Sequence, residues 1–126
     1  MKVLQVVETA YRATLEEQDD TIIWLTHAMR GAQAELDLLL SGNAVNYALV
    51  GQDASGLAFG EWRQTQPPRL ADDIAGLVKK GVQVHVVEED LAERGLANAH
   101  LVEGVGRIKR ASIPELMEAH DQVWHW

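Results

Sequence analysis

The stretch GVQVHVVEEDLAERGL, from Gly81 to Leu96, opens with β-branched residues and then runs into three consecutive acids. Val82 to Val87 predicts a buried strand, because valines favour the packed surface of a sheet. Leu91 to Arg94 predicts one helical turn, which Gly95 ends. Ligands of open α/β sheets bind just outside the carboxyl ends of the strands. Val87 to Asp90 is therefore the first place to expect a site.

The rest of the chain alternates between strand and helix patterns. Apolar runs predict four more strands, at Lys2–Glu8, Glu35–Leu40, Val105–Lys109 and Gln122–Trp126. Helical spacing and helix-start signals predict helices that end at Gly31, that span Ala44–Val50, that run from Pro67–Pro68 to Lys80, and that run from Ser112 to about His120. This order predicts one α/β domain with a parallel sheet flanked by helices and joined by right-handed crossovers.

Polar residues at the expected helix starts predict caps. Thr14–Glu17 and Ser112–Glu115 both fit the capping-box pattern, in which a hydroxyl and a glutamate satisfy the first backbone N–H groups. Asn43 is expected to cap the helix at Ala44–Val50. The prolines Pro67 and Pro68 suit the first turn of the next helix, since their fixed φ is already helical.

Composition narrows the class of protein. The chain has 126 residues, of which 47% are apolar and 24% are charged, as in soluble globular domains. No apolar run approaches the roughly 18 residues of a membrane span, and MKVLQVVET predicts a first strand rather than a signal peptide. There is no cysteine, so a disulfide framework is excluded and a cytoplasmic location is expected. The net charge of −8 argues against non-specific binding of nucleic acid, although it suits a basic protein partner.

The residues that could carry chemistry form no familiar pattern. There is no G-x-S-x-G element for a serine nucleophile and no thiol at all. The histidines are too scattered for metal-ligand spacing, at His27, His85, His100, His120 and His125. Glu88, Glu89 and Asp90 could serve as acid or base, but acids at a helix start are commonly partners of the helix dipole. No catalytic residue, metal or cofactor is predicted.

The turn Ser41-Gly42-Asn43 is a second candidate position. It lies where the strand Glu35–Leu40 ends and a helix begins, and backbone N–H groups at such a point favour an anion. A plain β–α turn has the same sequence, and no glycine-rich phosphate fingerprint accompanies this one. Both interpretations stay open.

Gly51 to Gln66 is the least regular part of the chain. It carries Leu57, Phe59 and Trp62, which either pack on another subunit or pack on their own domain. The terminal Trp124 and Trp126 add further apolar surface. Because aromatic residues anchor buried interfaces, these positions predict a stable oligomer with Phe59, Trp62, Trp124 and Trp126 at the contact.

The element E-D-L-x-x-R-G-L, at Glu89 to Leu96, follows the strand that ends at Val87. With the tryptophan-containing close at Val123–Trp126 and the SGNAV turn at 41–45, it resembles the DsrE/DsrF/DsrH superfamily of small sulfur-relay proteins, which includes the TusB, TusC and TusD subunits. The C-terminal half is most similar to DsrH/TusB. The Gly51–Gln66 insertion makes this chain longer than a usual TusB-type subunit.

The resemblance implies a cytoplasmic protein with a flavodoxin-like sheet of about five strands that assembles as an oligomer. Active members carry a persulfide on a cysteine at the strand end that corresponds to Val87. Valine supplies no thiolate, so this chain alone cannot carry the sulfur. The resemblance therefore implies a non-catalytic subunit in sulfur oxidation or tRNA thiolation, either homo-oligomeric or joined to cysteine-bearing DsrE/DsrF-like subunits, without direct contact to nucleic acid or membrane.

Two alternatives remain from the residues. One is a homo-oligomeric protein that binds a small ligand, and the weaker one is a carboxylate-based enzyme that uses Glu88 or Glu89. By family position, the expected pocket comprises Val87, Glu88, Glu89, Asp90, Ser41, Gly42 and Asn43.

Overall fold

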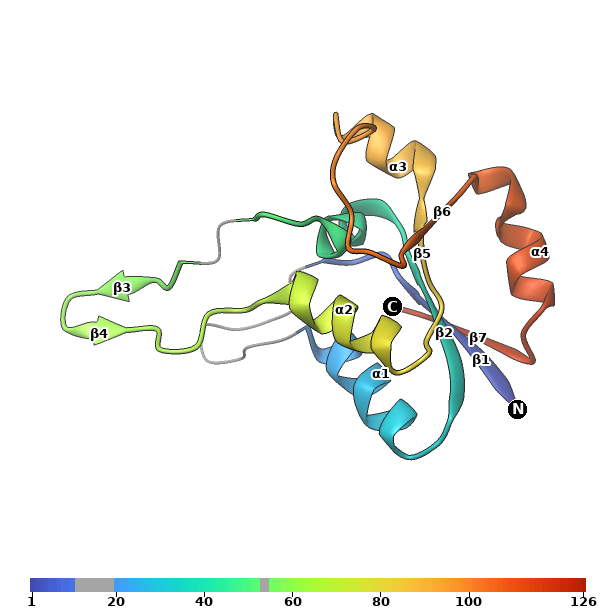
Figure 1. Ribbon diagram of the computed structural model, residues 1–126, viewed down its shortest axis with the longest axis horizontal. Helices are drawn as coiled ribbons and strands as arrows, with labels where there is room; N and C mark the ends of the chain where they lie inside the picture. The colour runs from blue at the N-terminus through green and yellow to red at the C-terminus, as the bar shows by residue number, and fades with distance from the viewer. Residues whose placement is uncertain (11–19, 53–54) are drawn as a thin grey trace.

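Five parallel strands form one sheet in the computed structural model, which describes residues 1–10, 20–52 and 55–126 (Figure 1). The strand order across the sheet is β6-β5-β2-β1-β7. The strands are β1 (Lys2–Val7), β2 (Glu35–Leu40), β5 (Val84–Val87), β6 (Gly106–Ile108) and β7 (Gln122–His125). Each one is paired in parallel with its neighbours. The predicted α/β class with an open parallel sheet is confirmed.

Helices cover both faces of this sheet. One face carries α1 (Thr21–Gly31), the 3-10 helix η1 (Gly42–Ala48) and α2 (Leu70–Lys79), whose apolar residues share one cluster with β1, β2 and β5. The other face carries the short η2 (Arg110–Ser112) and α4 (Ile113–Glu118). Between β5 and β6, α3 (Glu88–Glu93) lies beyond the strand ends. None of the described helices is long and apolar enough to cross a membrane.

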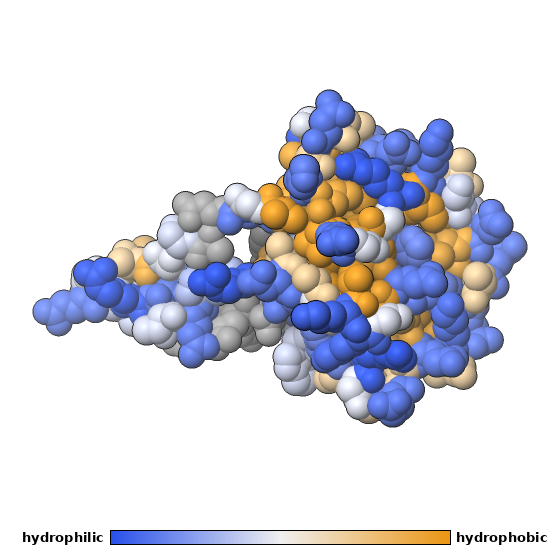
Figure 2. All heavy atoms as spheres, in the orientation of Figure 1, coloured by the Kyte–Doolittle hydropathy of each residue, from blue (hydrophilic) through white to orange (hydrophobic). Residues whose placement is uncertain are grey.

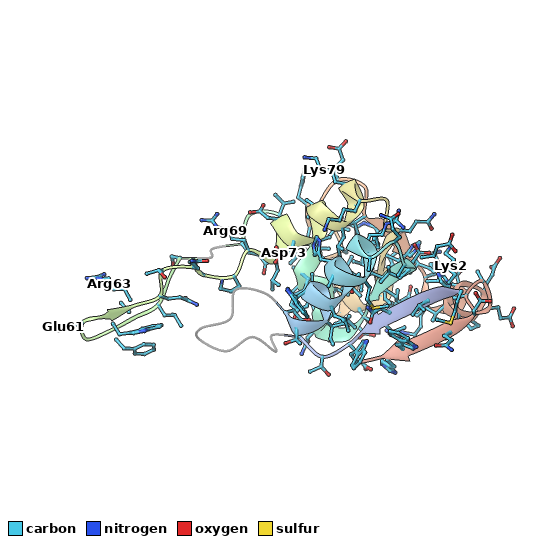
Figure 3. All side chains as sticks on the ribbon, turned by 90° about the horizontal axis from the view of Figure 1, so that it is seen from below. Lys2, Glu61, Arg63, Arg69, Asp73 and Lys79 are labelled. Atoms are coloured by element: carbon cyan, nitrogen blue, oxygen red, sulfur yellow. The ribbon has the colours of Figure 1, made fainter. Side chains whose placement is uncertain are left out.

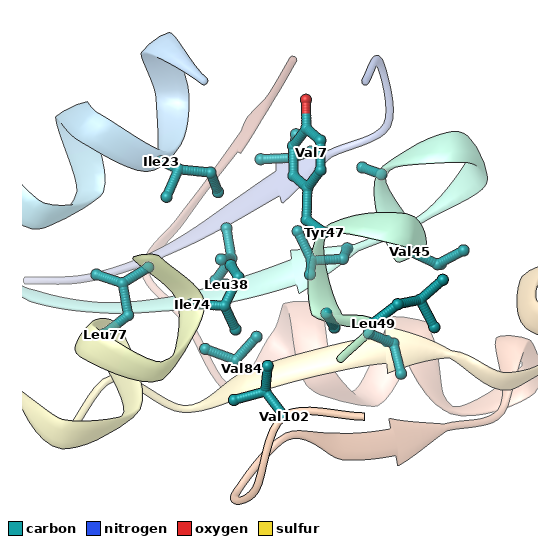
Figure 4. Close-up of a cluster of buried hydrophobic side chains, with 14 of the residues drawn as sticks. Val7, Ile23, Leu38, Val45, Tyr47, Leu49, Ile74, Leu77, Val84 and Val102 are labelled. Carbon is teal, nitrogen blue, oxygen red and sulfur yellow. The ribbon is translucent and has the colours of Figure 1, made fainter. Parts of the chain in front are cut away.

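The larger part of the core lies on the α1 and α2 side of the sheet. Figure 4 shows the side chains of Val7, Leu38 and Val84 pointing from three strands toward Ile74 and Tyr47. All are at most 2% exposed. Burial of each such aliphatic side chain contributes about 1.5–3 kcal/mol. On the opposite face α4 has no fully buried residue, so it is the more weakly packed layer.

The helix starts differ from the predicted caps. Asp20 caps α1, since its Oδ1 accepts from the N–H groups of Ile22 and Ile23 at 2.8 and 3.2 Å. The capping box expected at Thr14–Glu17 lies outside the described residues. The one expected at Ser112 is wrong, because that side chain makes no cap hydrogen bond.

Two further helix starts are also shifted. Asn43 lies inside η1, and Ser41 takes the preceding cap position. Pro67 and Pro68 precede α2, which begins only at Leu70. A proline disfavours helical geometry in the residue before it, so the Pro-Pro pair keeps the chain extended until the helix can start.

Residues 55–66 form a hairpin, here called the arm, which projects from the body of the molecule (Figure 1). Its strands are β3 (Ala58–Phe59) and β4 (Trp62–Arg63), joined by a two-residue turn in which Gly60 has φ +60°. Glycine at the first turn position is what a type II′ hairpin requires. The segment Gly51–Gln66, expected to be the least regular part of the chain, therefore contains a short hairpin.

Candidate functional site

A pocket of about 430 Å³ opens at the carboxyl ends of the parallel strands. Its floor consists of Val6, Leu39 and Val87, which are the apolar ends of β1, β2 and β5. Ile113 and Met117 of α4 form one wall. The three strand ends meet here because parallel strands finish at the same edge of a sheet. The floor is thus aliphatic.

The rim of the pocket is polar and carries both signs of charge. It consists of Glu8, Ser41, Gly42, Asp90, Arg94, Arg110 and His125. On one side, His125 Nε2 lies 2.8 Å from Glu8 Oε2, and both side chains are largely exposed. These two residues come from neighbouring strand ends, because β7 is paired with β1. The other side of the rim is organised around Asp90.

Asp90 is the most enclosed charge on the rim, with 12% of its side chain exposed. The backbone N–H of Gly42 donates to its Oδ2 at 2.7 Å, and Arg110 Nη2 donates to its Oδ1 at 2.6 Å. The hydrogen bonds to Asp90 and then to Glu93 raise the pKa of Arg110, so the guanidinium stays charged. Asp90 therefore occupies the backbone donor of the Ser41-Gly42-Asn43 turn that an external anion would have used.

Arg94 links the same turn to α3. Its Nε donates to Asn43 Oδ1 at 3.0 Å, and its Nη1 donates to the carbonyl of Asp90 at 3.0 Å. Asn43 thus positions an arginine instead of capping a helix. Arg94 of the sequence element Glu89–Leu96 accordingly connects α3 to the β2–η1 turn.

The sequence-predicted pocket residues divide into two groups. Ser41, Gly42, Val87 and Asp90 line the pocket. Glu88 is exposed in the first turn of α3, and Glu89 Oε2 accepts from the backbone N–H of Arg110 at 2.5 Å. Val87 itself ends β5 and is 1% exposed, with α3 beginning at the next residue.

Sequence reasoning missed two thirds of the residues that line the pocket. The missed lining residues are Val6, Glu8, Leu39, Arg94, Arg110, Ile113, Met117 and His125. The rule that sites lie at strand ends would have found Glu8 and His125 if it had been applied to the strands β1 and β7 as well. It would not have found the α4 residues, because the sequence does not say which face of the sheet that helix covers.

The four expected interface residues lie in two places. Phe59 and Trp62 are in the arm and are 60% and 40% exposed. Trp126 is 36% exposed and donates from Nε1 to Gln5 Oε1 at 2.7 Å, while Trp124 is half-buried on the edge strand β7. Trp24, on α1, is 58% exposed and was not expected.

A second polar cluster lies near the start of the strands, on the α4 side. Asp37 Oδ2 accepts from Lys2 Nζ at 3.0 Å and lies 2.9 Å from His120 Nε2, while its Oδ1 accepts from the N–H of Gln83. Burial alone would raise the pKa of Asp37, but the hydrogen bonds, led by that from His120, hold it below its ordinary value. The cluster is closed, since the side chains of Asp37 and His120 are only 5% and 1% exposed.

Comparison with known proteins supports the fold. No family model and no curated protein matches this chain. The crystal structure of the YchN protein from E. coli is similar to it, with a TM-score of 0.74 and 20% sequence identity over 99% of this chain and 98% of that one. At this identity the likeness shows the fold alone. The molecule has a flavodoxin-like arrangement, in which a parallel sheet lies between helices, and it shares this fold with YchN.

Proposed function

We propose that this chain is a non-catalytic, DsrE-like subunit of cytoplasmic sulfur trafficking, in sulfur oxidation or tRNA thiolation. In this role it joins a cysteine-bearing DsrE/DsrF-like subunit. The resemblance of the Glu89–Leu96 element to DsrH/TusB and the shared fold with YchN both support this assignment.

One observation carries the proposal. Val87, at the position where the resemblance puts the sulfur-bearing cysteine, forms part of the floor of the strand-end pocket. A persulfide requires a thiolate sulfur, and the chain contains no cysteine. In the proposed role the pocket would supply the walls of a sulfur-binding site without its nucleophile, which is what a supporting subunit of a relay requires.

The pocket would then act by enclosure. An aliphatic floor and an α4 wall would keep water and small thiols away from a persulfide that a partner subunit places at this edge. Arg110, which is 53% exposed at its side chain, lies at the entrance and would be attracted to the anionic sulfur. No covalent step occurs on this chain.

A small-ligand binding protein is the second candidate, and the pocket itself favours it. Its volume of about 430 Å³ falls within the roughly 300–1,000 Å³ that is typical of small-molecule sites. A ligand with an apolar body and a polar end would match the aliphatic floor and the charged rim. Carboxylate catalysis is less favoured, since neither Glu88 nor Glu89 lines the pocket.

The experiment is affinity capture of the tagged chain from cells of its own source, with mass spectrometry of both the partner and its cysteines. We expect a DsrE/DsrF-like subunit that carries a persulfide, while this chain gains no sulfur. Ser41→Phe, which fills the rim of the pocket, should reduce capture of that partner. Ser112→Phe is the matched control, because Ser112 is an exposed serine that does not line the pocket.

Two results would refute the sulfur role. One is a stable adduct of sulfur on the wild-type chain, and the other is capture that never includes a cysteine-bearing DsrE/DsrF-like subunit. If a small molecule co-purifies instead and Ser41→Phe releases it, the second candidate is correct.

A further inference from the structure

The arm is built as a separate unit with its own apolar contact. The rings of Phe59 and Trp62 lie 5.9 Å apart between centroids, one on each strand. The N–H of Gln64 donates to the carbonyl of Leu57 at 2.8 Å, which closes the hairpin at its base. Figure 3 shows Glu61 and Arg63 at the far end, well away from the helices of the body.

This hairpin is poorly covered in a single copy of the chain. Leu57, Phe59 and Trp62 are 48%, 60% and 40% exposed. An isolated two-stranded hairpin is only marginally stable in water, and clustered apolar surface on a soluble protein marks a contact site. A long aromatic arm therefore gains its stability from a surface that a single copy does not provide.

The body offers an apolar surface close to the base of the arm. Figure 2 shows hydrophobic residues gathered between the base of the arm and α3. We define the flank patch as five partly exposed apolar residues, of which the last four pack on the larger core cluster: Val50, Leu70, Val78, Leu101 and Val105. Two contacts bring parts of this set together. Leu49, next to Val50, bridges to Leu101, and Gly104, next to Val105, lies so close to Val78 that a Cβ there would meet Val78 Cγ1 at 2.6 Å.

We propose that the arm pairs two copies of this chain by exchange, each arm lying on the flank patch of the other copy. This inference rests on the proposed function only in that the chain works as an assembled protein. A single two-fold rotation that places one arm on the flank patch of the other copy also places the second arm on the flank patch of the first. Closed two-fold contacts of this kind are the commonest in soluble oligomers.

Surface area favours exchange over a single contact. A large side chain has roughly 200 Å² to bury, so the exposed parts of Leu57, Phe59 and Trp62 amount to roughly 300 Å² per arm. One arm on one patch would remove roughly 600 Å² from water, counting both surfaces, whereas stable interfaces need about 1,200 Å². Two reciprocal contacts reach that value, and one does not.

Charge also points to the arm as the element that meets a second copy. The whole chain carries −8, so two bodies repel each other at low salt. The arm contains only Glu61 and Arg63 among charged residues and is neutral. Exchange also brings the exposed Arg63 to the flank patch, beside which the exposed Glu103 lies.

The first test is sedimentation analysis of the wild type and of the double variant Phe59→Ala/Trp62→Ala. We expect a wild-type dimer, and a dissociation constant raised about thirtyfold or more in the variant, since a truncated aromatic anchor has at least that effect. Trp24→Ala is the matched control, because Trp24 is as exposed as Phe59 but lies on α1. Its dissociation constant should equal that of the wild type.

The second test locates the contact and uses the absence of cysteine from the chain. A copy with Glu61→Cys is mixed with a copy with Glu103→Cys and treated with a short bis-maleimide. We expect a cross-linked pair that contains one of each. Replacing the second copy by one with Ser112→Cys, an exposed serine before α4, should give little product.

A wild-type chain that stays monomeric at its highest soluble concentration would overturn the exchange. So would a dimer whose affinity is unchanged by both alanines, or equal cross-linking to positions 103 and 112. A monomer whose capture of a cysteine-bearing subunit requires Phe59 and Trp62 would overturn self-pairing while supporting the sulfur role. A dimer that captures no such subunit would support self-pairing and contradict the sulfur role.

Discussion

Two buried carboxylates on the α4 side of the sheet, Asp37 near the strand starts and Asp90 at the strand ends, are bound in similar ways. Each accepts from one backbone N–H and lies beside at least one cation. They differ in what surrounds them. Asp37 meets His120, whose side chain is 1% exposed, whereas Asp90 meets Arg110, whose side chain is 53% exposed beside an open pocket.

The difference separates a structural contact from a candidate site. At Asp37 every partner is held by the fold: β1 carries Lys2, and the end of the α4 segment carries His120. This contact attaches a helix that has no fully buried residue of its own. At Asp90 the cation can leave for a ligand without unfolding anything, because the guanidinium lies in solvent. The solvent exposure of the paired cation, and not the type of residue, distinguishes the candidate site from the structural contact.

Removal of Asp37 should have the largest effect on stability. Asp37→Ala leaves the buried side chain of His120 without its partner, whereas the Lys2 side chain, 41% exposed, stays solvated. Breaking a buried pair costs about 3–5 kcal/mol. Urea unfolding measures this loss. Asp121→Ala is the control, since Asp121 is an exposed carboxylate at the same edge that accepts from the N–H of Lys2, and it should lose far less. Equal losses would mean that Asp37 and Asp121 are not distinguished by burial.

Acid should weaken the same cluster in two stages. Burial lowers the pKa of His85, whose Nε2 has no hydrogen-bond partner among the described residues, below its ordinary value of 6.5. The pKa of Asp37 lies below 3.8. Both folded-state values are depressed, so both groups stabilise the protein above the unfolded pKa, and the stability is lost as pH falls through the folded value.

We therefore expect the free energy of unfolding to fall in two steps as the pH is lowered. It should be highest above pH 6.5, lower between pH 6.5 and 3.8, and lowest below pH 3.8. His85→Gln should remove the first decrease, and Asp37→Asn should remove the second. Stability that rises on acidification in the wild type would contradict the assigned directions.

Removal of Asp90 should cost less than removal of Asp37. Asp90→Ala leaves the N–H of Gly42 without its acceptor, a loss of about 1–3 kcal/mol, while Arg110 remains solvated. Glu93→Ala removes the more exposed partner of Arg110 and should change stability by at most about 1 kcal/mol. A loss at Asp90 as large as that at Asp37 would remove the distinction between an open and a closed cluster.

A small stability change is expected from Val87→Cys, which nearly conserves volume and should cost below about 1.5 kcal/mol. Incubation with a persulfide donor should add one sulfur atom, because residue 87 lies on the pocket floor. Val86→Cys is the matched control: it neighbours residue 87 but faces the opposite core, and it should stay unmodified in the folded protein. Intact-mass spectrometry distinguishes the two. Equal modification would show that the pocket gives no special access.

The strands could be predicted because a parallel sheet buried on both faces needs continuous apolar runs, as in ELDLLL at β2. The Asp37 cluster could not. A charged residue inside such a run indicates that a cation must be nearby, but its partners Lys2 and His120 lie 35 and 83 residues away. Only the strand order and the position of α4 bring them together.

The arm had a local signal that was overlooked. Phe59-Gly60-Glu61-Trp62 places a glycine at the first of two turn residues between aromatic ones, which is a hairpin pattern. Only a third of the pocket lining was predicted, for a similar reason. Val87 and Asp90 follow from one strand end, whereas Arg110 and Met117 depend on where the chain crosses after β6. Features set by neighbouring residues, such as a turn or a strand end, could be read from the sequence. Contacts between residues far apart in the chain could not.

The four tryptophans, Trp24, Trp62, Trp124 and Trp126, have a spectroscopic consequence, because all lie in the described part of the chain and none is fully buried. Indole emission shifts to the blue when water leaves its surroundings. The folded chain should therefore emit close to the wavelength of its unfolded form, and fluorescence will report unfolding poorly. The same indoles are suited to report association, since covering the arm would move Trp62 from water into an apolar contact.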